Sequence, residues 1–137
     1  MMAAWHSVLT GLPVLILQLA VTTGVFLVGL IVYFSLTPYR ELQLLRDGNV
    51  AAAVVLAGEM LALVVPLAAM LAHSVNVPDI VLWGIVAIIL QLIAAAAVAV
   101  VLRRLPAAIE RGEIGPALVL AAAQLSAGIL NAAAMSG

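Results

Sequence analysis

The stretch TPYRELQLLRDGN, residues 37–49, decides how this chain folds, because it gathers charge between two long apolar runs. It holds Arg40, Glu41, Arg46 and Asp47. Charged side chains stay out of hydrocarbon, so the stretch is expected to be the turn between two helices that cross a membrane. A second and weaker charged stretch, residues 103–114, is expected to be the turn of a second such pair.

Composition supports a membrane protein. Hydrophobic residues make up 67% of the chain and charged residues 8%, whereas about a quarter of a soluble domain is charged. The expected partner is therefore the lipid bilayer. The net charge of −1 and the absence of Lys argue against nucleic acid as a partner. The absence of Cys excludes a disulfide framework, a thiolate metal site and a Cys nucleophile.

Four apolar segments are long enough to span a bilayer, which needs about 20 residues. The predicted fold is an all-α integral membrane protein with four transmembrane helices, at about residues 12–36, 50–72, 80–102 and 115–135. Short connections predict two helical hairpins, residues 1–72 and 73–137. Pro13 and Pro116 are expected in first turns, and Pro38 disfavours helix at the residue before it. The N-terminus lacks the basic region of a signal peptide, so the first helix is expected to remain.

The arginines predict the orientation of these helices. All five lie in the first and third connections, and none lies at either terminus or in the middle turn. Arginine and lysine favour the cytoplasmic side of a bacterial membrane. Both charged connections are therefore expected in the cytoplasm, and both termini in the periplasm.

The two halves of the sequence resemble two copies of one repeat unit. At an offset of 64 residues, Gly48 corresponds to Gly112 and Leu56 to Leu120, and in each half a charged connection is followed by a helix rich in small residues. Both halves start outside, reach the cytoplasm and return. The predicted repeat is therefore a tandem parallel one, related by an axis along the membrane normal.

A further set of residues is similar to a known bacterial family. The set is Thr37-Pro38, Glu41, Gln43-Leu44, Asn49, Ala51-Ala52, Gly58, Pro66-Leu67, Pro78-Asp79, Trp83-Gly84, Gln91-Leu92, Gly128, Asn131-Ala132-Ala133 and Met135. It resembles the family catalogued as domain of unknown function 350, whose YjfL-like members are small inner-membrane proteins with the domain as a tandem pair. The resemblance implies four helices in the bacterial cell inner membrane, and it implies no reaction. Glu59 departs from the family pattern, in which a small or hydroxyl residue is usual.

A few polar residues fall at mid-membrane depth, where each is a functional candidate because of its cost. This candidate intramembrane polar layer consists of Glu59, Gln91, Gln124, Thr22 and Thr23. One interpretation is that the Gln and Thr side chains only join helices through hydrogen bonds. Glu59 has three interpretations: a neutral carboxyl bonded across a subunit contact, a proton- or cation-binding site, and a carboxyl shielded by lipid.

Other candidates lie near the membrane surfaces. On the outer side they are His73, Asp79 and Asn131, with Asp79 also expected to cap the third helix. In the first charged connection, Glu41 is expected either to form a solvated pair with Arg40 or, with Arg46 and Asp47, to contact a cytoplasmic protein partner. No catalytic, cofactor-binding or metal-binding pattern is present. An enzyme is therefore not expected.

Small residues are abundant along the second, third and fourth helices, and such surfaces let helices approach closely. Four short helices carry more of this surface than one bundle uses, which predicts a homo-oligomer. The sequence therefore favours a structural or assembly component of the inner membrane that anchors a cytoplasmic partner. The alternative is a small proton or cation channel or carrier that uses the polar layer.

Overall fold

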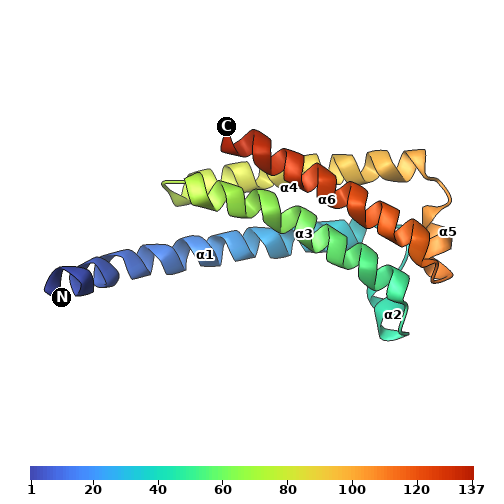
Figure 1. The fold of residues 1–137 in the computed structure, drawn as a ribbon, viewed down its shortest axis with the longest axis horizontal. Helices are drawn as coiled ribbons and strands as arrows, with labels where there is room; N and C mark the ends of the chain where they lie inside the picture. The colour runs from blue at the N-terminus through green and yellow to red at the C-terminus, as the bar shows by residue number, and fades with distance from the viewer.

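The computed structural model describes all 137 residues and is entirely helical. Four long helices are apolar enough to cross a membrane, α1 (Met2–Leu36), α3 (Val50–His73), α4 (Val77–Val101) and α6 (Ile114–Ser136). Two short helices, α2 (Glu41–Arg46) and α5 (Leu105–Glu110), lie in the charged connections (Figure 1). The predicted all-α fold with four candidate spanning helices is confirmed.

Helix α1 begins about ten residues earlier than the sequence predicted. It runs through Pro13, which lies inside the helix and not in its first turn. At about 1.5 Å per residue, 35 residues extend about 52 Å, more than the roughly 30 Å of a hydrocarbon core. None of residues 2–20 is buried. Figure 1 shows this half of α1 extending well past the other helices.

Helices α3 and α6 form the centre of the molecule. They make the most extensive contact between any two elements, and small residues bring their backbones together. A Cβ added at Gly58 would lie 2.6 Å from the Cβ of Ala121, and one added at Gly128 would collide with the Ala62 backbone. Gly at these positions is required by the close approach.

The remaining long helices cover this central pair. Helix α4 contacts α1, α3 and α6, while α1 contacts α4 and, less extensively, α3. Each predicted hairpin therefore packs against the other: the two first helices, α1 and α4, touch, and so do the two second helices, α3 and α6. Burial in α1 is confined to its second half, at Thr22, Gly29 and Tyr33.

The two charged connections have the same local shape. Both α2 and α5 have six residues, start 64 positions apart and are followed by a glycine with positive φ, Gly48 at +81° and Gly112 at +77°. Glycine adopts this left-handed conformation without steric penalty. Asn49 joins the two connections, since its Oδ1 accepts from the Ala52 amide at 3.0 Å and its Nδ2 donates to the Ile109 carbonyl at 2.8 Å.

The middle turn differs from the prediction in its cap. Helix α4 begins at Val77, and Asn76 is its N-cap, with Oδ1 accepting from the Asp79 amide at 3.0 Å. The expectation that Asp79 caps this helix is therefore wrong. Asp79 lies in the first turn, where its negative charge still suits the positive end of the helix dipole.

Candidate functional site

Glu59 is the most completely enclosed charged residue of the protein. It lies on the face of α3 that carries Val55, Gly58 and Ala62, all of which are buried, and its own exposed fraction is 0%. Neither carboxyl oxygen has a hydrogen-bond partner. An ionised carboxylate in such a place is expensive, because nothing replaces the water that it has lost.

Two glutamines from other helices accompany Glu59. Gln91 of α4 and Gln124 of α6 are 1% and 2% exposed, and the Gln91 Nε2 donates to the Gln124 backbone carbonyl at 3.1 Å. The Gln91 amide lies beside the Glu59 carboxyl, outside the geometry of a hydrogen bond. Glu59, Gln91 and Gln124 therefore form one buried polar cluster, which three of the four long helices supply.

The hydrogen-bonding capacity of this polar cluster depends on whether Glu59 carries a proton. The side-chain oxygens of both glutamines are buried and without a partner. A neutral Glu59 carries one O–H donor that such carbonyl oxygens accept, whereas an ionised one has only acceptors. Because the carboxyl is enclosed by its own chain, the interpretations that place Glu59 at a subunit contact or against lipid are wrong.

The two threonines of the predicted layer do not join the polar cluster. The Thr22 hydroxyl donates to the Gln18 carbonyl at 2.7 Å, and that of Thr23 to the Leu19 carbonyl at 2.8 Å. Each is therefore satisfied within α1. Thr22 is buried and Thr23 exposed, since successive helical residues point about 100° apart and cannot both face the bundle.

A second buried acid lies where the first charged connection folds back on α1. Glu41 is 2% exposed, and its Oε1 accepts from the Tyr33 hydroxyl at 3.4 Å. Burial raises the pKa of Glu41 to about 7, and the Tyr33 hydrogen bond opposes this only in part. The expectations that Glu41 is solvated or contacts a partner are therefore wrong. Arg46 and Asp47, the other two residues expected to contact a partner, are exposed.

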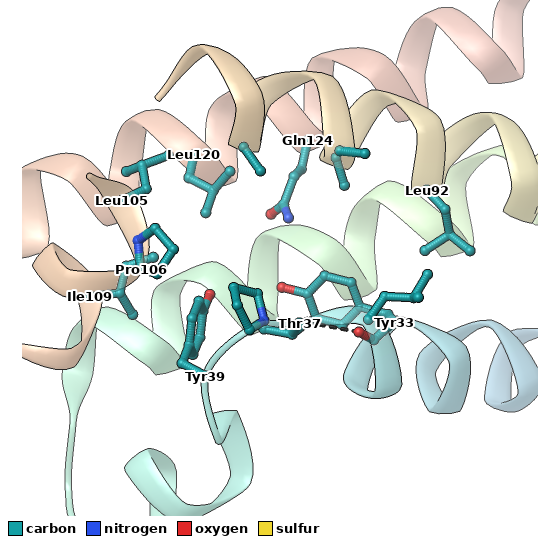
Figure 2. Close-up of a pocket in the computed structure, with 14 residues that line it drawn as sticks. Tyr33, Thr37, Tyr39, Leu92, Leu105, Pro106, Ile109, Leu120 and Gln124 are labelled. Atoms are coloured by element: carbon teal, nitrogen blue, oxygen red, sulfur yellow. Dashed lines mark hydrogen bonds between the residues drawn. The ribbon is translucent and has the colours of Figure 1, made fainter. Parts of the chain in front are cut away.

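A pocket of about 130 Å³ lies beside these residues, between the ends of α1 and α4 and the helices α5 and α6. Figure 2 shows the Gln124 amide pointing into it from one side, and the Tyr33 and Tyr39 rings on the other. Of its 14 lining residues, 10 are hydrophobic. We call it the elbow pocket. Its polar walls continue the polar cluster toward the charged connections.

The outer-side candidates gather at the other end of the bundle. His73, Asp79 and Asn131 all line a pocket of about 430 Å³ between the ends of α3, α4 and α6. The Asn131 Nδ2 donates to the Ala87 carbonyl at 3.1 Å, and the His73 Nδ1 lies 2.8 Å from the Ala69 carbonyl. No three His, Cys, Asp or Glu side chains are grouped to hold a metal ion.

Comparison with known proteins gives the family. The family described as Domain of Unknown Function (DUF350) matches residues 7–135. The chain belongs to the DUF350 family. It is 32% identical to the UPF0719 inner membrane protein YjfL of Escherichia coli K12. The match extends over 110 residues, which are 80% of this chain and 83% of that protein. The Escherichia coli O157:H7 protein of that name matches equally, and no solved structure matches.

Family membership and the four candidate spanning helices together place this DUF350 chain in the bacterial inner membrane, as predicted. The family carries no assigned function.

Sequence reasoning missed the part that Tyr33, Tyr39 and Glu41 play in this DUF350 chain. No sequence pattern singled out the two tyrosines, which are only 6% and 8% exposed. The available signal was Pro38. It ends α1 and lets α2 turn back, so that the Glu41 side chain reaches Tyr33 eight residues before it.

Proposed function

We propose that this protein binds and transfers protons within the inner membrane, and that Glu59 is the proton-binding group. The observation that carries the proposal is the complete burial of a carboxyl whose two oxygens lack partners, beside two amides whose oxygens also lack partners. Such a group exchanges a proton with its surroundings at a much lower energetic cost than it holds an unpaired charge.

Buried polar side chains extend from Glu59 toward both ends of the bundle. Toward the charged connections they are Gln124, Tyr33 and Glu41, and toward the middle turn the next is Asn131, whose pocket His73 also lines. A chain of side chains that donate and accept hydrogen bonds is what proton transfer requires. We infer that protons use this series of groups.

A proton fits the polar cluster better than a metal ion does. Cations such as Ca²⁺ need six or more oxygen ligands around an open space. The cluster offers one carboxyl and two amides, and Glu59 lines neither the elbow pocket nor the outer pocket.

Proton flux into liposomes tests the proposal. The purified protein is reconstituted into vesicles that hold a pH-sensitive dye, and flux is driven by a potassium gradient with valinomycin. Wild-type protein is expected to acidify the lumen, and Glu59→Gln to match empty vesicles. Glu110→Gln, the same change at an exposed residue of α5, is the matched control. Equal flux in wild type and Glu59→Gln would rule the proposal out.

We further propose that the two hairpins arose by duplication and that both termini face the periplasm. Two features support the duplication: α2 and α5 have the same length, and each is followed at the same distance by a glycine with positive φ. The five arginines, all on the two connections that these short helices occupy, support the orientation. In this orientation the elbow pocket faces the cytoplasmic side.

A second candidate function is an assembly component that forms a homo-oligomer and anchors a cytoplasmic partner. The observation that favours an oligomer is that no other helix covers the N-terminal half of α1. This half exposes large apolar residues such as Leu9, Leu12, Leu15 and Ile16. The exposed Arg46 and Asp47 remain available to a cytoplasmic protein. Mass measurement in nanodiscs is expected to give more than one copy, and a monomer would exclude the oligomer.

A further inference from the structure

We propose that the elbow pocket binds the neutral ring headgroup of a membrane-soluble phenol. The proposal goes beyond proton transfer, because neither the pocket nor the binding depends on Glu59, which does not line it. It stands on three features of the pocket: its opening, its polar groups and its size.

The elbow pocket opens between two membrane-spanning helices. Leu36 at the end of α1 is 67% exposed, and the lining residues Ala96 and Ala99 of α4 are exposed as well. Exposed apolar side chains on a spanning helix face lipid. A ligand therefore enters sideways from the hydrocarbon, which selects molecules that dissolve in the bilayer.

The polar groups of the elbow pocket suit a neutral oxygen. Gln124 is 2% exposed, its Oε1 has no partner, and its amide points into the pocket opposite Tyr33 (Figure 2). Such an oxygen needs a donor, which the O–H of a phenol supplies and a quinone, with acceptors alone, does not. The Tyr33 hydroxyl already donates to Glu41. The lining includes no Arg, Lys, Asp or Glu. Phosphate and carboxylate heads would find no cation there, so they are excluded.

The size of the elbow pocket limits the ligand to one ring. Its volume is about 130 Å³, close to the roughly 150 Å³ of an engineered apolar cavity that binds benzene. The Tyr39 and Pro106 rings form part of the wall (Figure 2). A single substituted ring fits this space, and its alkyl tail leaves through the opening between α1 and α4.

Calorimetric titration of detergent-solubilised protein with 4-hexylphenol, a phenol with one alkyl tail, tests the proposal. Wild type is expected to bind saturably with one site per chain. Ala96→Phe places a ring in the pocket and is expected to abolish binding. Ala97→Phe, on the neighbouring exposed residue of α4 that does not line the pocket, is the matched control and is expected to bind as wild type does.

Two further measurements separate a specific site from partition into the detergent. Gln124→Leu removes the amide at a similar side-chain size and is expected to weaken binding about fivefold, the equivalent of about 1 kcal/mol for one hydrogen bond. Hexylbenzene, which lacks the hydroxyl, is expected to displace 4-hexylphenol poorly. No saturable binding by wild type, or equal binding by wild type and Ala96→Phe, would overturn the proposal.

Glu59→Gln distinguishes this proposal from proton transfer. The variant is expected to lose proton flux and to keep its affinity for 4-hexylphenol. Loss of binding in Ala96→Phe together with undiminished flux in Glu59→Gln would support the ligand site and reject the proposed function.

Discussion

Two buried acids distinguish this chain at the scale of single residues. Glu59 lies within the bundle beside two amides and has no hydrogen bond, whereas Glu41 lies in a charged connection and accepts one long hydrogen bond from Tyr33. The difference matters for experiment. Glu41 lies outside the spanning segments, so its titration can be followed through the stability of the protein.

Stability is expected to depend on the protonation of Glu41. Its pKa is raised from an ordinary value of 4.5 to about 7 by burial, so the folded state holds this proton more tightly than the unfolded state does. An acid with a raised pKa stabilises the fold most below its unfolded value, and the contribution is lost as the pH rises through the folded value. Melting temperature in mild detergent is therefore expected to fall between about pH 4.5 and about pH 7.

The Glu41→Gln variant checks the cause of this slope. It keeps the shape of the side chain and cannot titrate, so its melting temperature is expected to vary less over the same range. Glu110→Gln, at an exposed residue, controls for the general loss of one negative charge. A wild-type slope that Glu41→Gln leaves unchanged would show that another group is responsible.

At the scale of elements, the contact between α3 and α6 holds the polar cluster together. Glu59 comes from α3 and Gln124 from α6, and Gly58 and Gly128 allow the two backbones to approach. No hydrophobic force draws helices together in lipid, so dispersion between closely packed surfaces is the main attraction. Widening this contact would therefore loosen both the fold and the site.

Gly58→Ala is expected to destabilise the protein by about 1–3 kcal/mol, the usual range for forcing an extra carbon into a packed core. The added Cβ would lie 2.7 Å from the Ala121 backbone Cα, so one helix has to move. Gly24→Ala in α1 is the control, because a Cβ there meets nothing within 4 Å. Thermal unfolding in detergent is expected to give a lower melting temperature for Gly58→Ala and an unchanged one for Gly24→Ala. Equal melting temperatures of the two variants would contradict the close packing of α3 and α6.

At the scale of the whole molecule, α1 is the element that the bundle does not fully use. Its second half packs on α4 and α3, while none of its residues from 2 to 20 is buried. A helix longer than the hydrocarbon is thick has to tilt or leave the membrane at one end. The orientation of the chain decides on which side the N-terminal end of α1 emerges.

Reporter fusions at the C-terminus of α6 test the proposed orientation. Alkaline phosphatase, which is active only in the periplasm, is expected to be active there, and green fluorescent protein, which folds only in the cytoplasm, to be dark. The same reporters placed after Asp47, in the charged connection, are expected to give the opposite result. A bright C-terminal fluorescent fusion would reverse the orientation inferred from the arginines.

The sequence by itself determined the class of fold, because solvent imposes it. In a bilayer each backbone amide has to be hydrogen-bonded within its own helix. Four apolar segments separated by charged residues and proline are therefore expected to form four spanning helices. The depth of Glu59, Gln91 and Gln124 followed from the same count of residues. The early start of α1 was not predicted, because Pro13 is compatible with both a first turn and the interior of a long apolar helix.

Only the tertiary structure decided which polar residues meet. Sequence gives each residue its depth in the membrane, but the rotation of each helix about its axis is set by packing with its neighbours. That packing brought Gln91 and Gln124 to Glu59, turned Thr23 outward and enclosed Glu41 beneath Tyr33. The elbow pocket likewise exists only where α1, α4, α5 and α6 come together.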